Sequence, residues 1–454
     1  MARKYVIETF GCQMNVHDAE RMAGLLEQAG YEPGTSVDTA DVVVLNTCSV
    51  RERAEEKLFS RLGELRPASD APLPSRVLAV TGCVAQQEGA AIAKRAPFVD
   101  LVVGTQALKQ LPSMLARVWQ STDAAVRVDV NPYEDVSFPL GVVRRGDPTR
   151  AYITIIEGCN DYCAFCVVPY TRGHERMRPA AQILAEAHEA ARSGRREIQL
   201  LGQIVNHYEA PDDPSCDFAG LLGRVSDVPG IERIRFASPH PRHVTPRLIG
   251  AIRDLPKVCK HLHLPVQSGS TRVLAAMRRR HTREQYLDLL DRLRAEVPGL
   301  SLSTDLIVGF PGETQSDFDD TLALLDRAQY ESIFSFKYSP RPNTLAAKRL
   351  VDDVPEPEKS RRLELLQQVQ RGIQTALHER AVGTVQTVLV DSVSRRREHE
   401  MSGRTTGNTV VNFPGEPEAI GRFADVLIER VGPHSLWGTV QQFEQPGGRT
   451  CSSR

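Results

Sequence analysis

Three cysteines lie close together in the segment EGCNDYCAFCVVPYTRG, residues 157–173. Cys159 and Cys163 are separated by three residues, and Cys163 and Cys166 by two. Nine cysteines are present in all, an odd number that fits a disulfide framework poorly. In a reducing compartment, clustered thiols in a long chain more often bind metal. The spacing therefore indicates a metal-binding loop.

Three interpretations of this loop compete. A structural zinc site normally takes four protein ligands, and no Cys or His pair at zinc-finger spacing completes such a set here. Ordinary buried cysteines fit poorly, because Gly158, Asn160 and Asp161 predict an exposed loop directly after the strand-like AYITIIE. An iron–sulfur cluster held by three thiolates leaves one iron open, and catalysis at a metal requires an open position. The sequence favours the cluster.

A CxxxCxxC pattern directly after a predicted strand is the signature of the radical S-adenosylmethionine enzymes, and the chain resembles them in this respect. The resemblance implies that Cys159, Cys163 and Cys166 hold a [4Fe-4S] cluster. It further implies that the open iron chelates the amino and carboxylate groups of S-adenosylmethionine. An electron from the cluster then cleaves the sulfonium to a 5′-deoxyadenosyl radical.

The residues that follow predict alternating strands and helices. Six runs are typical of strands: YITIIE, EIQLLG, RIRFAS, HLHLPV, LSTDLIV and SIFSFKY. Helical stretches such as AAQILAEAHEAARSG and TPRLIGAIRDL separate them. Repeated βα units imply a parallel sheet that curves toward a barrel. This pattern resembles the partial (β/α)6 barrel of the radical family.

Barrels of this kind carry their chemistry at the C-terminal ends of the strands. Gly202 and Gln203 follow the second predicted strand, Gln267 and Ser268 follow the fourth, and Gly309 follows the fifth. By resemblance, the first pair contacts the methionine amine, and the other three lie near the ribose and adenine. Glycine after a strand is also ordinary turn chemistry, so these assignments depend on their joint order behind the cysteine loop.

A second set of three cysteines lies near the N-terminus. Cys12 follows YVIETFG, Cys48 follows DVVVLNT and Cys83 follows RVLAVTG, so each thiol comes after a run typical of a buried parallel strand. In an open α/β sheet, ligands gather outside the carboxyl ends of the strands, so we expect these thiols to converge. Three ordinary buried cysteines are the alternative. The other cysteines show no such setting, and we expect no role for them: Cys216, Cys259 and Cys451.

Two sets of three cysteines in this order resemble the methylthiotransferases, a branch of the radical S-adenosylmethionine enzymes. Within that branch, FGCQMNVHDAE, LNTCSVRERAEEK, LHLPVQSGS and FKYSPRPNT are similar to the tRNA-modifying type. The ribosomal-protein type tends to have Pro-Lys, and the threonylcarbamoyl-adenosine type Lys-Val, where this chain has Gln13 and Met14. The resemblance implies tRNA as partner, with N6-isopentenyladenosine next to the anticodon as substrate and its 2-methylthio derivative as product.

The same resemblance implies two [4Fe-4S] clusters and S-adenosyl-L-methionine as cofactors. Because the radical cluster uses its open iron for S-adenosylmethionine, Cys12, Cys48 and Cys83 are predicted to carry the sulfur and the methyl group. We expect a monomer that takes electrons from a low-potential donor such as flavodoxin, with the sulfur donor left open. The same chemistry on another tRNA adenosine or on a ribosomal-protein aspartate is the alternative. Two alternatives come from other functional classes: an electron-transfer protein and an RNA-binding module with structural metals.

The last part of the chain predicts a small β-barrel. Strand-like runs at VGTVQTVLVDS, TVVNFPG, FADVLIERV and SLWGTVQ are separated by Gly, Asn and Pro. This region resembles the TRAM domain, an OB-like barrel found on RNA-modifying enzymes. Arginines 395–397 and Arg404 suit phosphate contact and Phe413 suits base stacking, so we predict that Arg404 and Phe413 contact RNA. A solvated arginine run and a core phenylalanine are the alternative.

The predicted organisation has five parts: an N-terminal open parallel α/β sheet domain over residues 1–120, a linker over 121–147, the radical S-adenosylmethionine domain over 148–377, the TRAM barrel over 378–443 and a disordered tail over 444–454. The formal net charge of -1 gives no basic footprint for the whole chain, so an RNA partner depends on local features. MARKYVIETF lacks an apolar signal core, and no run approaches the roughly 18 apolar residues of a membrane span. We therefore expect a cytoplasmic protein without a membrane segment.

Overall fold

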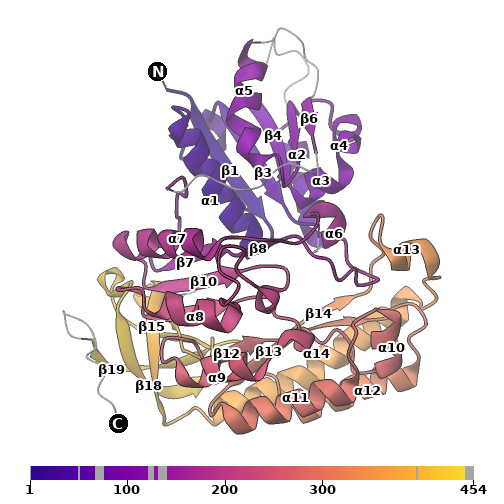
Figure 1. The fold of residues 1–454 in the computed structure, drawn as a ribbon, viewed down its shortest axis with the longest axis vertical. Helices are drawn as coiled ribbons and strands as arrows, with labels where there is room; N and C mark the ends of the chain where they lie inside the picture. Colours follow the sequence, from indigo (N-terminus) through magenta and orange to yellow (C-terminus); the bar gives the residue numbers. More distant parts are fainter. Residues whose placement is uncertain are drawn as a thin grey trace.

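The computed structural model describes residues 2–49, 52–66, 76–120, 127–130, 141–394 and 397–444. Figure 1 shows an N-terminal α/β domain on top of a broad central domain, with a small barrel docked beside the latter. Several predictions lie outside the described residues: most of the linker, Arg395, Arg396, Cys451 and the tail beyond Glu444. Within the described ranges, no helix combines the length and the apolar character that crossing a bilayer requires.

The N-terminal domain contains a parallel sheet in the order β2-β1-β3-β4-β5-β6. Its strands are β1 (Lys4–Phe10), β2 (Glu32–Pro33), β3 (Val42–Thr47), β4 (Val77–Gly82), β5 (Leu101–Val103) and β6 (Arg127–Asp129). Its helices are α1 (Gln13–Gln28), α2 (Glu52–Glu64), α3 (Cys83–Glu88), α4 (Ala90–Arg95) and α5 (Leu111–Gln120). The predicted open parallel α/β domain is confirmed.

Both faces of this sheet are buried, as the continuous apolar runs predict. Val42 and Val44 pack into a core with residues of α1 and α5, whereas Val43 and Leu45 pack into a second core with residues of α2 and α4. The pairing register aligns Phe10 with Thr47 and Thr47 with Gly82. The ends of β1, β3 and β4 therefore lie at one sheet edge, which is the edge that faces the central domain in Figure 1.

The central domain contains the six predicted parallel strands, in two three-stranded sheets ordered β7-β10-β11 and β12-β13-β14. They are β7 (Arg150–Thr154), β10 (Glu197–Leu201), β11 (Arg233–Phe236), β12 (His261–His263), β13 (Ser301–Val308) and β14 (Ser332–Lys337). The sheets are connected just before β12, where Ile234 N donates to Lys257 O and Cys259 N donates to Ile234 O (2.7 and 2.9 Å). The curved radical-type sheet is confirmed.

Helices alternate with these strands and cover their outer face (Figure 1). They are α7 (Ala180–Arg192), α8 (Phe218–Ser226), α9 (Pro246–Asp254), α10 (Thr271–Ala276), α11 (Arg283–Glu296), α12 (Gln315–Ala328) and α14 (Glu356–Glu379). Threonine side chains accept the first free backbone N–H groups of three of them, at Thr245, Thr282 and Thr314. These caps fix where each helix begins after its loop.

The C-terminal domain is a closed barrel in the order β15-β16-β17-β19-β18. Its strands are β15 (Val385–Val393), β16 (Glu400–Arg404), β17 (Val410–Pro414), β18 (Phe423–Val431) and β19 (Leu436–Phe443). Arg235 connects it to the central sheet, because the side chain donates to Thr405 O (2.6 Å) and to buried Glu197 (3.0 Å). Burial raises the pKa of Glu197, but Arg235 and Arg150 outweigh this and lower it to about 2.

Two strands show where the structure departs from the predicted organisation. The edge strand β6 lies inside the predicted linker of residues 121–147. The sequence does not predict it, because three residues of mixed polarity give no strand pattern. The barrel strand β16, EMSGR, was not predicted, because it is short, polar and contains glycine. Both strands form through pairing with neighbours: β6 pairs with β5, and β16 pairs with β15 and β17.

Candidate active site

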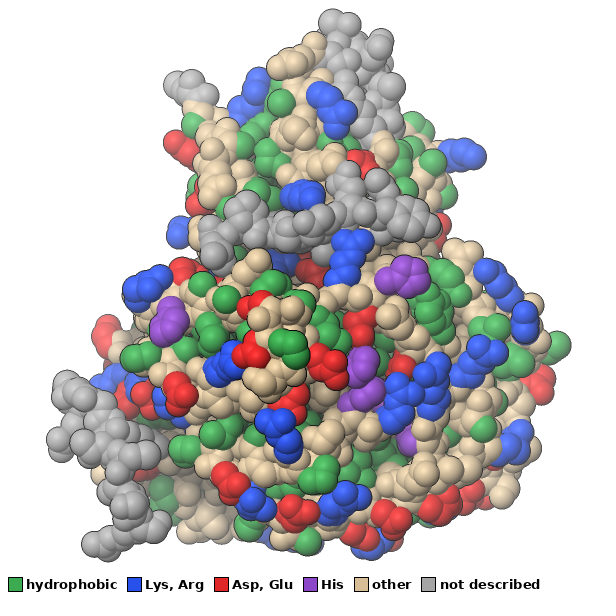
Figure 2. All heavy atoms as spheres, in the orientation of Figure 1, with side chains coloured by type: hydrophobic (Ala, Val, Ile, Leu, Met, Phe, Trp, Pro, Cys, Tyr) green, Lys and Arg blue, Asp and Glu red, His purple; other side chains and the backbone are tan. Residues whose placement is uncertain are grey.

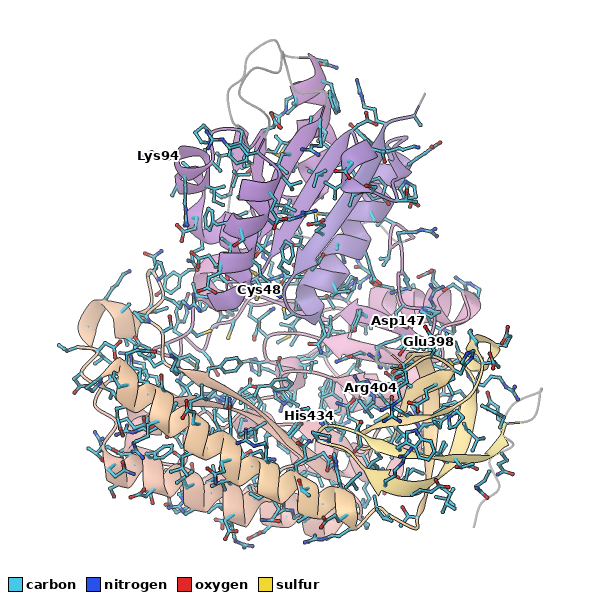
Figure 3. All side chains as sticks on the ribbon, turned by 180° about the vertical axis from the view of Figure 1, so that it is seen from behind. Cys48, Lys94, Asp147, Glu398, Arg404 and His434 are labelled. Carbon is cyan, nitrogen blue, oxygen red and sulfur yellow. The ribbon has the colours of Figure 1, made fainter. Side chains whose placement is uncertain are left out.

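The three N-terminal thiols converge at one sheet edge, as predicted. Cys12 precedes α1, Cys48 directly follows β3 and Cys83 is the first residue of α3. Figure 3 places Cys48 at the end of the N-terminal domain that faces the central domain. A hydrogen bond between the Cys12 and Cys48 side chains lowers the pKa of Cys12 to about 6, despite burial, which raises it. This thiol is therefore readily available as a thiolate, the form that binds metal.

A buried amide pair holds this edge in shape. Asn15 Nδ2 donates to Asn46 Oδ1 (3.2 Å) and to Thr47 O (3.1 Å), and Asn46 Nδ2 donates to Asn15 O (2.7 Å). Asn15 Oδ1 lies 3.3 Å from Cys12 Sγ. Gly82 completes the arrangement, because at its φ of 91° a Cβ atom would lie 2.5 Å from Asn46 Oδ1. Cys12, Cys48 and Cys83 are thus positioned by one connected unit.

Arg172 connects this edge to the central domain. It follows the third cysteine of the radical loop by six residues, and its Nη2 donates to Asp18 Oδ2 on α1 (2.6 Å). Burial raises the pKa of Cys83, whereas a hydrogen bond from Arg172 lowers it. The backbone near Arg172 is also fixed, since Gln106 Nε2 donates to Arg172 O (3.0 Å). A cation from the central domain therefore contacts the thiols of the N-terminal domain.

The second set of thiols lies in the loop that follows β7 and the short strand β8 (Ile156–Glu157). Cys159 is 9% exposed, which is less than predicted, while Cys163 and Cys166 are half-buried. Asp161 N donates to Cys159 Sγ (3.5 Å), and Cys166 N donates to Cys163 O (3.0 Å). Burial raises the pKa of Cys159 to about 11 and that of Cys166 to about 12. Metal binding here must therefore release protons.

Arg279 holds this loop from the end of α10. Its Nη1 donates to Cys163 Sγ (3.4 Å) and its Nη2 to Pro265 O (2.8 Å). Ala164 N donates to Met277 O (2.9 Å), so the backbone of the cysteine loop is bonded to the same turn. Each set of three thiols thus has one buried guanidinium beside it, Arg172 at the first and Arg279 at the second. A cation beside thiolates stabilises their negative charge.

The five residues predicted to bind S-adenosylmethionine all follow strands of the central sheet. Gln203 Oε1 is buried and, within the described residues, has no hydrogen-bond partner. Gly202 packs closely, since a Cβ atom would lie 3.2 Å from Ile156 Cβ beside the cysteine loop. Gln203 therefore offers a free acceptor just after β10, and its predicted binding role remains a prediction.

The other three residues of that group already have structural contacts. Gln267, at a φ of 81°, donates from its N to Asp305 O and accepts from Ile307 N (both 2.9 Å). Ser268 is fully buried, and its Oγ accepts from Ser270 N (3.2 Å). At Gly309, a Cβ atom would lie 2.4 Å from Lys359 Cγ of α14. Their predicted contacts with ribose and adenine stay predictions.

Two buried histidines, which the sequence did not single out, lie beside Arg279. His240 and His281 have ring centroids 5.6 Å apart. His240 Nε2 lies 3.8 Å from Asp161 Oδ2, whereas His281 Nε2 has no hydrogen-bond partner in the described part of the chain. Burial and the charge of Arg279 lower the pKa of His240 and lower that of His281 to about 4. Both rings are therefore neutral near pH 7, and His281 Nε2 is available to bond a ligand.

The thiol sets differ from sites for a single metal ion. Among the described residues, no group of three or more His, Cys, Asp or Glu side chains is placed to hold one metal ion. A [4Fe-4S] cluster takes one thiolate at each iron and so does not require three thiols around one ion. The donor sets fit such clusters in chemistry: each is three thiols at strand ends beside a buried arginine.

The two predicted RNA contacts have different outcomes: the one at Phe413 is wrong, and the one at Arg404 stays a prediction. Phe413 has no exposed surface and packs inside the C-terminal barrel, so the predicted base stacking is wrong and the core interpretation applies. Arg404 lies where the barrel meets the central domain (Figure 3). Its Nε lies 3.5 Å from Asp391 Oδ2, and its carbonyl accepts from Arg233 at the start of β11. It therefore lies near the strand end opposite to the cysteine loop.

Three known families match successive parts of the chain. Residues 4–104 match the family described as Uncharacterized protein family UPF0004, residues 153–325 the Radical SAM superfamily and residues 379–440 the TRAM domain. The first match contains all three N-terminal cysteines, and the second contains the cysteine loop after β7. The third covers most of the closed barrel.

Curated relatives match almost the whole chain. A protein from Halorhodospira halophila is 49% identical over 448 residues, which are 98% of this chain and 94% of that protein. One from Methylococcus capsulatus is 47% identical over 450 residues (97% and 96%), and one from Neisseria meningitidis serogroup B is 47% identical over 442 residues (96% and 99%). Each is named tRNA-2-methylthio-N(6)-dimethylallyladenosine synthase.

Solved structures share the fold. A radical S-adenosylmethionine methyltransferase from Kitasatospora setae, with cobalamin and a [4Fe-4S] cluster bound, matches with a TM-score of 0.55. The match covers 85% of this chain and 77% of that chain, at 14% sequence identity. At this identity the likeness concerns the fold rather than the reaction.

Proposed function

The chain belongs to the radical S-adenosylmethionine methylthiotransferases named tRNA-2-methylthio-N6-dimethylallyladenosine synthases, and we propose how its own residues divide that reaction. It is an enzyme that converts N6-dimethylallyladenosine (N6-isopentenyladenosine) in tRNA to the 2-methylthio derivative. The observation that carries the proposal is the pair of thiol sets, one at the edge of the N-terminal sheet and one in the loop after β7, connected through Arg172.

Cys159, Cys163 and Cys166 hold the cluster that binds S-adenosylmethionine, and Cys12, Cys48 and Cys83 hold a second cluster in this proposal. When bound, the first supplies the electron that starts radical chemistry, and the second supplies a site for sulfur and its methyl group. Two molecules of S-adenosylmethionine are used for each product, one as the methyl source and one as the radical source. Gln203 and His281 each provide a buried polar atom without a hydrogen-bond partner among the described residues.

Arg172 is the positioning residue between the two sets. Its guanidinium is held by Asp18 at 2.6 Å and donates to Cys83, so its charge is directed at the thiols that are to carry sulfur. A buried cation stabilises thiolates and any further negative sulfur bound near them. Because Arg172 is carried by the same loop as the other three cysteines, docking of the two domains completes the N-terminal site.

Replacing Arg172 with Gln is expected to lower the yield of 2-methylthio product by about tenfold or more. A hydrogen bond from a charged group contributes about 1.5–3 kcal/mol, and about 1.4 kcal/mol corresponds to tenfold in rate. In a background with Cys159, Cys163 and Cys166 changed to Ala, the same replacement should also lower retained iron. Iron analysis therefore reports on the N-terminal thiols independently of turnover.

Arg21→Gln is the matched control. Arg21 crosses the same domain interface and donates to Glu157 Oε1 at 2.9 Å, whereas Arg172 donates to Cys83. If the Arg21 and Arg172 variants lose iron and product equally, Arg172 acts through domain docking alone. Arg172→Lys retains the charge without the planar guanidinium and should recover part of the loss.

The remaining parts of the proposal concern the surroundings of the enzyme. We propose a cytoplasmic monomer that receives electrons from a low-potential donor such as flavodoxin. Mass spectrometry of tRNA nucleosides, from a strain that lacks this gene with and without the gene restored, tests the function. The 2-methylthio nucleoside should disappear and return. Normal tRNA together with a missing methylthio mass on a ribosomal protein would contradict the proposal.

A further inference from the structure

Three consecutive arginines follow α10 at the border of the cysteine loop. Arg278 and Arg280 have left-handed backbone conformations, with φ of 59° and 56°. Such conformations are costly for residues other than glycine and persist where the surrounding structure enforces them. Here Arg279, between them, is buried against Cys163 Sγ and Pro265 O. The turn therefore buries one guanidinium beside the radical loop and leaves Arg278 and Arg280 exposed.

A further arginine lies beside these two. Arg242 belongs to the short helix η4 (Pro241–His243), and its Nη2 lies 3.2 Å from Asp161 Oδ1 in the cysteine loop. Arg280 Nη1 lies 3.7 Å from the same carboxylate oxygen. Arg278 forms no ion pair within the described residues. We call Arg242, Arg278 and Arg280 the arginine rim; the Asp161 carboxylate lies beside two of its three positive charges.

Aromatic surface accompanies this charge. His207 and His243 have ring centroids 4.3 Å apart and planes tilted by 36°, and His243 Nε2 lies 3.2 Å from Arg242 Nη2. Figure 2 shows Lys or Arg and His side chains gathered on this face, next to α10. Exposed guanidinium groups next to aromatic rings are the combination that single-stranded RNA contacts use, for phosphates and for base stacking.

We propose that the arginine rim binds the phosphates of the RNA strand on either side of the target adenosine. This inference rests on the proposed function, because the modified base must come close to the loop of Cys159, Cys163 and Cys166. Phosphates that flank a base in that position must lie near the edge of the same loop. The rim lies at that edge, whereas Arg404 lies near the opposite ends of the strands.

The test is the salt dependence of binding of tRNA that lacks the 2-methylthio group. Arg278→Gln together with Arg280→Gln should weaken binding about tenfold at physiological salt. It should also reduce the slope of log K against log salt by about 0.7 for each lost contact, the value for single strands. Arg278→Lys with Arg280→Lys retains both charges and should keep the slope close to that of the parent protein.

A second pair of substitutions separates charge from folding. Glycine adopts left-handed backbone conformations without strain, so Arg278→Gly with Arg280→Gly should preserve the melting temperature and still lose affinity. Arg253→Gln with Arg327→Gln is the matched control. Both of these arginines are exposed and lie at the C-terminal ends of α9 and α12, so binding should not change.

Three outcomes would overturn the inference. The first is an unchanged slope in both the Gln and Gly variants. The second is an equal loss in the Arg253 and Arg327 control, which would indicate non-specific attraction. The third is weaker binding of S-adenosylmethionine with unchanged RNA binding, because the rim would then serve the small cofactor. Failure of the parent protein to bind or modify this tRNA would instead count against the proposed function itself.

Discussion

Replacement of Cys12, Cys48 and Cys83 with alanine should eliminate 2-methylthio product while 5′-deoxyadenosine is still formed. The reason is the separation of the two thiol sets: these three lie at the edge of the N-terminal sheet, and the thiols proposed for S-adenosylmethionine cleavage lie in another loop. The latter have their own guanidinium, Arg279, and retain it in this variant. Liquid chromatography with mass spectrometry measures both products in one anaerobic reaction with excess reductant.

The chain offers matched controls for this experiment in Cys216 and Cys259. Both thiols are buried in the central domain, at 1% and 3% exposure, and both lie outside the two sets. Alanine at these positions should leave both products in place, because only small buried volumes are removed. Methylthio product at an appreciable rate from the triple N-terminal variant would refute the assignment of sulfur transfer to Cys12, Cys48 and Cys83.

The fold was largely predictable because its strands carry strong local patterns. In β3, all residues from Val42 to Thr47 are buried on both faces, and the run of β-branched residues already indicates this. The six strands of the central sheet have similar apolar runs. The strands β6 and β16 have no such apolar run, and their pairing with neighbouring strands places them in their sheets. The pairing partner and register of a strand depend on the folded chain, so a short strand without an apolar run cannot be predicted from its own residues.

The thiols of the site were predictable for two different reasons. Cys159, Cys163 and Cys166 are close in the sequence, so their spacing alone predicts a common site. Cys12, Cys48 and Cys83 are far apart, but each follows a strand, and parallel strands end at one edge. For these three thiols, the prediction came from the order and direction of the strands and not from closeness in the sequence.

The charged and aromatic residues of the site were not predictable in this way. Arg172 contacts Asp18 across 154 positions, and Arg279 contacts Cys163 across 116, so no local pattern pairs them. Phe413 shows the opposite case, because a local sequence pattern does indicate that its side chain faces the core. In β17, Val411 and Phe413 alternate with half-buried Val410 and Asn412, the period of two that marks a core-facing side.

The reciprocal experiment concerns Cys159, Cys163 and Cys166. With all three changed to alanine, anaerobically reconstituted protein should lose about half of its iron, from about eight to about four per chain, and should cleave no S-adenosylmethionine. The N-terminal thiols keep their hydrogen bonds to one another and to Arg172 in this variant, so their iron should remain. A colorimetric iron assay and 5′-deoxyadenosine detection provide the two measurements.

The two triple variants together test the division of roles more sharply than either alone. Each should retain about half of the iron, but only the N-terminal variant should produce 5′-deoxyadenosine, and neither should produce the methylthio nucleoside. Arg279→Gln is a milder variant, because it retains all six thiols of the two sets but removes the guanidinium 3.4 Å from Cys163 Sγ. Cleavage of S-adenosylmethionine should therefore fall, whereas the iron held by the N-terminal set should remain. Stoichiometric zinc in protein purified without added metal, or cleavage that survives loss of Cys159, Cys163 and Cys166, would show that the radical cluster has been assigned to the wrong thiols.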